Sequence, residues 1–177
     1  MRWRKKGSER VPEIHIEAKT IRDVVVDPDH ADRTESPTFR KAKERLKDDG
    51  HYRCYICGTD RNLQVHHRGA EFMFNEIVDF DKLKEFCEEW DLYGYGRLLK
   101  AQPITTVDDI RNQMVLCSTH HISVDHENGN SGTGIHDMSF SSWIIQKLAK
   151  EGANPVPQPG ETAQQAMQDV KSKEATK

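Results

Sequence analysis

Two pairs of metal-ligand residues constrain this chain more than any other feature. The first is Cys54-x-x-Cys57, and the second, much further along the chain, is Cys117-x-x-His120. Two such pairs supply the four soft ligands of a closed tetrahedral zinc site. A redox motif is the alternative for the first pair, but no thioredoxin-like βαβ pattern surrounds it and the second pair would stay unexplained. The sequence therefore predicts a structural zinc ion that joins two distant segments.

The composition indicates why such a chain would need a metal ion. Of its 177 residues, 35% are hydrophobic and 31% are charged. This balance is typical of one modest core with solvated segments, and the chain is too short for two domains with separate cores. Zinc would stabilise that core, because the free energy of metal binding adds to the free energy of folding.

No segment predicts a membrane span or a secretion signal. No window approaches the roughly 18 consecutive apolar residues of a spanning helix. The start of the chain, MRWRKK, lacks the apolar stretch of a signal peptide. In a reducing compartment, paired cysteines are more typical of metal sites than of disulfides. We therefore expect a soluble, cytoplasmic protein without membrane contact.

The apolar pattern predicts an α+β fold in which additional helices surround a small core. Polarity alternates over 51–54 and 63–67, which predicts a two-stranded ribbon. Helical spacing predicts four helices, expected over 37–49, 79–92, 117–127 and 140–151. Cys87 falls on the apolar stripe of the second of these helices, so we expect it to be a core residue.

Three regions follow one another along the chain. Residues 1–35 form an arm of mixed charge, with a short strand expected at Val24–Val26. Residues 36–152 form the folded domain, in which 71–111 is a helical insertion. Residues 153–177 are rich in Pro, Gln, Ala and Lys, which predicts a disordered tail with at most a weak helix over 161–171.

The histidines include two adjacent pairs, His66-His67 and His120-His121. Adjacent side chains point in different directions on a strand or a helix. One histidine of each pair can therefore face zinc or the core while the other faces a cleft. If His120 binds zinc, His121 turns toward another side of its helix.

The segments Cys54–Cys57, Leu63–Arg68 and Asn112–His121 together resemble the HNH endonucleases, a family with a zinc-binding ββα fold. The resemblance is limited to these short blocks and leaves most of the chain outside it. It implies that His67 is a general base and that His66 and His121 bind a catalytic divalent cation. It also implies a structural zinc site made by Cys54, Cys57, Cys117 and His120.

The position of the family asparagine is occupied by Asn112, and the resemblance implies that this residue orients the base and its loop, with a direct hydrogen bond from its side chain to the imidazole. The connection between His67 and Asn112 is longer than is usual in the family, and Asn75 is the alternative for this role. His120 stands where cysteine is commoner, a replacement that zinc accepts readily.

A third histidine could complete the catalytic metal site. The segment Gly134-Ile135-His136 resembles phage-borne members of the family, which points to His136 and to a phage or prophage origin. Asp125 and His126 are the alternatives, because they follow His121 at helical spacing. For each of these three residues a structural or solvated role stays open.

The function implied by the resemblance is metal-dependent endonuclease activity, by nicking or double-strand cleavage of DNA. A bound Mg²⁺ or Mn²⁺ ion would neutralise the phosphate and stabilise the leaving oxygen, while neutral His67 takes a proton from the attacking water. DNA would be held mainly through its phosphates, so low sequence specificity is expected.

Two other functions stay open on the sequence alone. The chain could be a non-catalytic zinc module that binds nucleic acid or protein, or a degenerate HNH protein with a structural role. The net charge of −3 counts against DNA binding, because proteins that bind phosphates usually carry a basic excess. The zinc module also leaves His66, His67 and His121 without a function.

Overall fold

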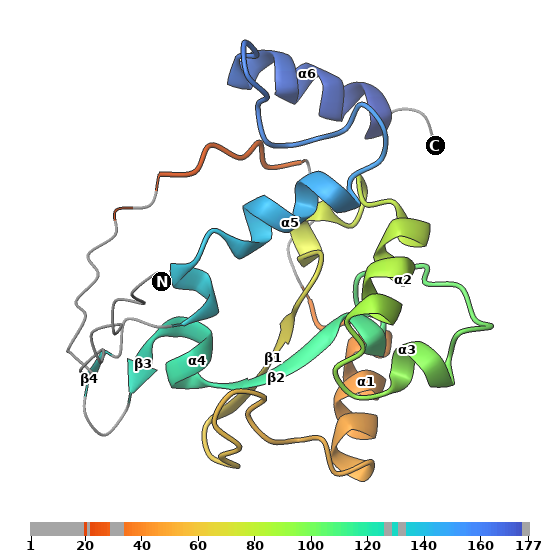
Figure 1. Ribbon diagram of the computed structural model, residues 1–177, viewed down its shortest axis with the longest axis vertical. Coiled ribbons are helices and arrows are strands. Elements are labelled where there is room, and N and C mark those ends of the chain that lie inside the picture. Colours follow the sequence, from red (N-terminus) through yellow and green to blue (C-terminus); the bar gives the residue numbers. More distant parts are fainter. Residues whose placement is uncertain (1–19, 21, 29–33, 126–128, 131–133, 175–177) are drawn as a thin grey trace, which may run out of the picture.

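The computed structural model describes residues 20, 22–28, 34–125, 129–130 and 134–174. Most of the predicted N-terminal arm, His126 and the last three residues of the chain lie outside the described residues. Six α-helices are found among the residues described, around a two-stranded antiparallel sheet (Figure 1). The predicted α+β class is confirmed at this level.

The central sheet pairs β1 (Leu63–His67) with β2 (Gln113–Cys117). The strands are antiparallel, with Val65 opposite Val115. Every residue of β2 is buried, as expected for a short apolar strand that is covered on both faces. The helix α4 (Ser118–Ile122) follows β2 directly, so the two strands and this helix form a compact ββα arrangement.

The predicted pairing of 63–67 with 51–54 is wrong. Residues 51–54 form no strand and lead instead into a tight loop, in which the Gly58 N–H donates to the Cys54 carbonyl at 2.8 Å. The Tyr55 N–H donates to the Val115 carbonyl at 2.8 Å, so this loop packs against the outer edge of β2. Pairing with β2 is preferred because its apolar side chains bury more hydrophobic surface than the polar 51–54 segment would.

The first predicted helix is confirmed as α1 (Pro37–Asp48). Ser36 caps it by accepting a hydrogen bond from the Phe39 N–H at 3.0 Å, and proline occupies the first helical position, where no backbone donor is needed. Phe39, Ala42 and Leu46 are buried on the inner face. The basic residues of the helix lie mostly on the outer face.

The segment between β1 and β2 is largely helical. It contains α2 and α3, together with two 3-10 turns, and the bounds of these elements are Phe72–Phe74 (η1), Phe80–Glu89 (α2), Tyr95–Leu98 (α3) and Ile110–Asn112 (η2). The predicted helix over 79–92 is confirmed by α2. Cys87 on α2 is completely buried in the main hydrophobic cluster, which confirms its predicted place in the core.

Arg68 joins this segment to the end of β1. Its guanidinium is almost fully buried and lies over the rings of Phe86 and Trp90, with its carbon 5.1 and 5.3 Å from the two ring centroids. Its Nε donates to the Arg111 carbonyl at 3.0 Å. Cation–π contacts of this kind stabilise a desolvated guanidinium, so Arg68 fixes α2 beside the strand that carries the histidine pair.

The predicted helix over 117–127 is too long. Helix α4 ends at Ile122 because Ser123 adopts a left-handed conformation with φ of 60°, which a helix cannot continue through. The chain then enters β3 (Val124–Asp125), which pairs with β4 (Gly129–Asn130). The Ser123 hydroxyl accepts a hydrogen bond from the Gly134 N–H at 2.6 Å and so holds the turn to a later segment.

The prediction of a disordered tail is wrong for residues 153–174. Helix α5 (Phe140–Leu148) is followed by α6 (Ala163–Glu174), which lies beyond α5 at one end of the molecule (Figure 1). Ala166 and Val170 of α6 are buried. Two apolar residues four positions apart make a narrow helical stripe, and this signal is lost in the average composition of the tail. The weak helix expected over 161–171 is confirmed.

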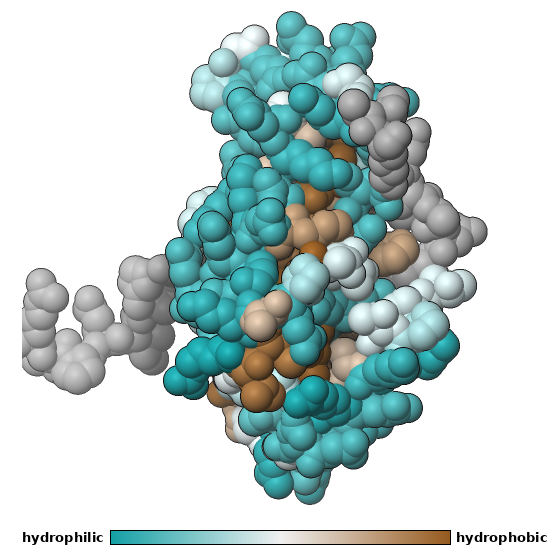
Figure 2. Space-filling view, turned by 90° about the vertical axis from the view of Figure 1, so that its right-hand side faces the viewer, coloured by the Kyte–Doolittle hydropathy of each residue, from teal (hydrophilic) through white to brown (hydrophobic). Residues whose placement is uncertain are grey.

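The described part of the N-terminal arm is extended but forms no strand. The Val26 N–H donates to the Pro155 carbonyl at 2.7 Å, so the arm contacts the segment between α5 and α6. On the face that Figure 2 presents, a band of apolar side chains runs between hydrophilic regions. Within the described residues, no helix combines the length and the apolar character that a bilayer crossing requires.

Candidate metal centres

Three thiols and one imidazole converge beside the end of β2. The possible ligand atoms of Cys54, Cys57, Cys117 and His120 all lie within 4.8 Å of one another. The sulfurs of Cys57 and Cys117 are 3.9 Å apart, and His120 Nδ1 is 3.6 Å from Cys54 Sγ and 3.2 Å from Cys117 Sγ. Ligands around a tetrahedral zinc ion lie roughly 3.3–3.8 Å apart. This predicted cluster could therefore hold a metal such as zinc.

Local backbone geometry places these four ligands. Gly58 ends the first loop with φ of 74°, a conformation that favours glycine, and this turn directs both cysteines of the first pair to the same side. Cys117 is the last residue of β2, and His120 lies in the one-turn helix that follows. Residues three apart on a helical turn lie on one face, so His120 meets Cys117.

The two cysteines of the first pair differ in the pKa of their thiols. Burial opposes ionisation of Cys54, but backbone N–H groups of Cys57, Cys117 and Ile56 outweigh it and lower the pKa of Cys54 to about 6. A backbone hydrogen bond from Thr59 favours the Cys57 thiolate, yet burial and the neighbouring sulfurs outweigh it and raise the pKa of Cys57. Adjacent thiolates repel one another, and a bound dication would remove that repulsion.

Cys87 contrasts with this cluster. Burial raises the pKa of its thiol to about 11, and the residue lies in the hydrophobic core. Thiols kept neutral in apolar surroundings are chemically inert. Cys87 is therefore a packing residue and offers a matched control for the cysteines of the cluster.

A second cluster consists of His66, His121 and His136, whose ligand nitrogens also lie within 4.8 Å of one another. His121 Nε2 is 3.2 Å from His66 Nδ1 and 3.1 Å from His136 Nε2. The structure thus brings the strand histidine, the helix histidine and the predicted third histidine together. His126 lies outside the described residues, and of Asp125 only the backbone, in β3, is described.

The side chain of Gln64 orients the central ring of this cluster. Gln64 Oε1 is hydrogen-bonded to His121 Nδ1, and a carbonyl oxygen can only accept, so Nδ1 carries the proton. The lone pair of His121 then lies on Nε2, which faces the other two histidines. Fixing the tautomer of a metal-binding histidine through its second nitrogen is the usual role of such a partner.

A close contact between two loops places His136. Gly134 lies so near to Ser123 that a Cβ on the glycine would be 2.5 Å from the Ser123 backbone nitrogen. The hydroxyl of Ser123 also donates to Asp137 Oδ2. These contacts hold the 3-10 turn η3 (Ile135–Asp137) beside α4, and the His136 ring lies 4.8 Å from that of His121, centroid to centroid.

His67 lies on the other side of the strand and is held by a buried carboxylate. Its Nε2 is 2.7 Å from Asp108 Oδ1, and both residues are 4% exposed. The hydroxyl of Ser36 donates to Asp108 Oδ2 at 2.6 Å. Because a carboxylate accepts the bond, Nε2 carries the proton and Nδ1 keeps a lone pair. Within the described part of the chain, no hydrogen bond to Nδ1 is found.

Asn112 makes no hydrogen bond with the imidazole of His67, so the predicted direct hydrogen bond between them is wrong. Asn112 is completely buried; its Oδ1 accepts from the N–H groups of Gly69 and Ala70 at 2.9 and 3.3 Å, and its Nδ2 donates to the Ala70 and Val107 carbonyls at 2.9 and 2.8 Å. The backbone that follows the histidine pair is therefore fixed by Asn112. Its role in positioning the loop agrees with the sequence prediction.

The alternative asparagine has a different partner. Asn75 Oδ1 accepts a hydrogen bond from the Val107 N–H at 3.1 Å, so Asn75 fixes the backbone beside Asp108. It contacts neither histidine of the strand pair in the hydrogen bonds found among the described residues.

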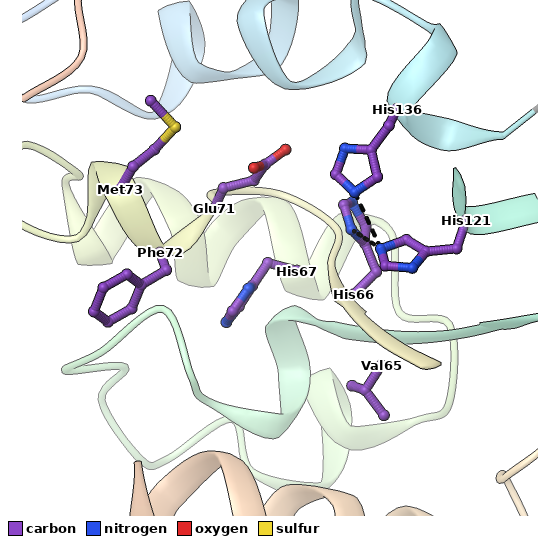
Figure 3. Close-up of a pocket in the computed structure, with 8 residues that line it drawn as sticks. All are labelled: Val65, His66, His67, Glu71, Phe72, Met73, His121 and His136. Atoms are coloured by element: carbon purple, nitrogen blue, oxygen red, sulfur yellow. Dashed lines mark hydrogen bonds between the residues drawn. The ribbon is translucent and has the colours of Figure 1, made fainter. Parts of the chain in front are cut away.

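One cavity of about 260 Å³ joins the second cluster to His67. Figure 3 shows His66, His121 and His136 gathered on one side of it, and His67 with Phe72 on the other. Its lining consists of Val65, His66, His67, Glu71, Phe72, Met73, His121 and His136. The structure therefore places three possible metal ligands and a further imidazole around one space.

Two residues of this region were not predicted from the sequence. Asp108 lies in the run Thr105–Asp109, where nothing in the spacing separates it from an ordinary turn carboxylate. Glu71 begins the helical segment after β1, and the sequence pattern assigns it to the insertion without distinguishing it from the other residues there. Its distance of four residues from His67 is a weak signal, which gains meaning only when the cavity is known.

The chain was compared with protein-family models, with curated proteins and with solved structures, and none of these comparisons gives a match. Any assignment of activity therefore depends on the residues and the geometry described above.

Proposed function

We propose that this protein is a metal-dependent endonuclease that hydrolyses phosphodiester bonds in DNA. The observation that carries the proposal is the single cavity in which three imidazoles can bind a cation and a fourth imidazole can accept a proton. The resemblance of the histidine pairs to HNH endonucleases supports the same assignment. Hydrolysis needs both parts, because the phosphate must be neutralised and the water must be deprotonated.

The three-histidine cluster would bind the divalent cation. Nitrogens 3.1 and 3.2 Å apart have the spacing of neighbouring ligands about 2.0–2.1 Å from one metal ion. Three ligands leave coordination positions for water and for a phosphate oxygen. With Mg²⁺ or Mn²⁺ bound, the site would stabilise the negative charge that develops on the phosphate and on the leaving oxygen.

His67 would act as the general base through Nδ1. Asp108 fixes the ring through Nε2, which assigns the proton to that nitrogen and leaves Nδ1 able to accept one. The imidazolium that forms would be stabilised by the same carboxylate, as in other hydrolases with an oriented histidine. Asn112 would act one step further away, by fixing the loop at Gly69 and Ala70.

A zinc-dependent module without catalytic activity is the competing function. Such a module needs Cys54, Cys57, Cys117 and His120, but it does not require a second ligand cluster with an oriented tautomer. The hydrogen bond between Gln64 and His121 favours the catalytic proposal, because a purely structural helix has no need to direct the His121 lone pair into a cavity.

The test is cleavage of supercoiled plasmid by zinc-loaded protein. With Mg²⁺ or Mn²⁺ we expect nicked or linear products, and with excess chelator of these ions we expect none. His66→Ala is expected to reduce the rate by about 100-fold or more, because it removes a metal ligand. If the wild type leaves the plasmid intact while zinc content stays near one ion per chain, the non-catalytic module is the better assignment.

Asp108→Asn is expected to lower the cleavage rate on the order of 10²-fold. The amide removes the negative charge and permits the other tautomer of His67, but it keeps the size of the side chain. The measurement is single-turnover cleavage alongside Mn²⁺ affinity, which should stay unchanged because Asp108 is not part of the three-histidine cluster. Asp60→Asn, at an exposed position, is the control; a matching loss in this control would argue against a specific role for Asp108.

A further inference from the structure

Glu71 is the one carboxylate among the described residues that line the histidine cavity. It lies between the end of β1 and the 3-10 turn η1 and is partly buried. In Figure 3 its carboxylate lies at the cavity on the side of His136, while Phe72 and Met73 extend the other way. Glu71 is therefore an acidic group that faces the side of the cavity where the three possible metal ligands lie.

The carboxylate of Glu71 has no hydrogen bond or ion pair with any described residue. Apolar side chains, those of Val65, Phe72 and Met73, form much of the cavity around it. A charged group that is partly removed from water and unpaired costs free energy, unless water or a cation compensates for it. The cavity thus contains a negative charge for which the protein itself supplies no described partner.

Glu71 stands outside the group of nitrogens that lie within 4.8 Å of one another. Its oxygens are therefore too far from at least one histidine for all four residues to bind a single ion directly in this arrangement. A carboxylate that does not bind the ion directly can act through its water, since a metal-bound water donates hydrogen bonds to a carboxylate.

We propose that Glu71 accepts hydrogen bonds from water on the divalent cation held by His66, His121 and His136, and so favours a hydrated cation such as Mn²⁺ or Mg²⁺. This inference rests on the proposed function. Three imidazoles alone bind Zn²⁺ more tightly than Mn²⁺, following the general order of metal affinities. A four-coordinate Zn²⁺ ion on three histidines keeps one water, whereas an octahedral Mn²⁺ or Mg²⁺ ion keeps several, so a carboxylate that accepts hydrogen bonds from bound water offsets part of that preference.

The test compares Glu71→Gln with wild type in the zinc-loaded, full-length protein. Mn²⁺ binding is followed by the electron paramagnetic resonance signal of free Mn²⁺, and binding of a second Zn²⁺ ion by titration calorimetry. We expect the Kd for Mn²⁺ to rise by about 10- to 100-fold, while the Kd for the second Zn²⁺ ion changes by less than about threefold. Glu85→Gln, on the exposed side of α2, should change neither Kd.

Each other outcome overturns the role of Glu71. An unchanged Kd for Mn²⁺ means that the carboxylate does not reach the hydrated cation, and an equal loss for both ions means that it has no preference for the hydrated one. The proposed function fails separately: if wild type binds Mn²⁺ in a Glu71-dependent manner but cleaves no DNA, the metal site stands without the nuclease. If wild type cleaves DNA and Glu71→Gln binds Mn²⁺ normally, only the inference about Glu71 is lost.

Discussion

Replacing His67 with glutamine is expected to slow plasmid cleavage by about 10²- to 10⁴-fold, the usual contribution of a general base. The glutamine amide can still donate a hydrogen bond to Asp108, but it cannot take a proton from water at neutral pH. The loss should therefore appear in the rate of the chemical step, measured under single-turnover conditions. Mn²⁺ affinity should be almost unchanged, because His67 lies outside the three-histidine cluster.

His51→Gln is the matched control for this variant. His51 packs against Tyr93, with ring centroids 4.9 Å apart, and it does not line the cavity. This control should keep wild-type cleavage and zinc content. Cleavage by His67→Gln at the wild-type rate would remove His67 as the base, and a loss of zinc from this variant would mean that the ring supports the fold instead.

The local parts of the fold could be predicted because adjacent residues carry them. Ser36 and Pro37 predict the start of α1, and the spacing of apolar residues predicts α2 and α5. The two ligand pairs predict the zinc cluster, since the chemistry of zinc limits which residues can meet. In each case the signal lies within a few residues or in the ligand types themselves.

The parts that were mispredicted depend on contacts between distant segments. The alternation at 51–54 is a real local pattern, but β1 pairs with β2 because that sheet buries more apolar surface. The end of α4 depends on Ser123 and its contact with Gly134. The spacing of apolar residues along the sequence gives no sign of such a contact. Likewise, α6 is ordered by the burial of Ala166 and Val170, two small contributions that composition hides.

The same distinction applies to the candidate site. His66 and His121 could be predicted from the sequence because the family resemblance marks them, whereas His136 was one of three alternatives for the third ligand. The partner of the proposed general base could not, since Asp108 reaches His67 only after the long insertion has folded back on β1. The asparagine that was expected to bind the imidazole fixes the loop backbone instead, and a sequence does not distinguish these two roles.

Removing zinc from the proposed site of Cys54, Cys57, Cys117 and His120 is expected to have the largest effect on stability. Binding free energies of structural zinc sites are about 10–16 kcal/mol in small peptides, which equals or exceeds the net stability of about 5–15 kcal/mol of an ordinary domain. Cys117→Ser is therefore expected to lack a cooperative thermal transition at zinc concentrations that saturate wild type. The measurement is calorimetry with zinc content determined on the same samples.

Two replacements separate loss of zinc from loss of a cysteine. Cys87→Ala removes a buried thiol outside the cluster and should keep zinc, with a cost of only about 1–2 kcal/mol. His120→Cys keeps four ligands that zinc accepts and should keep both zinc and the cooperative transition. If Cys117→Ser unfolds like wild type without zinc, the cluster does not stabilise the fold.

We expect Mn²⁺ binding at the three-histidine cluster to require zinc at the first cluster, and zinc binding not to require the three-histidine cluster. His121 directly follows His120 of the proposed zinc site on α4, so we expect a loss of zinc to release the short helix that places the central ring of the second cluster. Zinc removal is therefore expected to abolish Mn²⁺ binding as well as the fold. His121→Ala, in contrast, should lose Mn²⁺ binding and keep zinc, because none of the zinc ligands contacts its ring in the hydrogen bonds of the described residues. Loss of zinc from this variant would show that the clusters form a single cooperative unit.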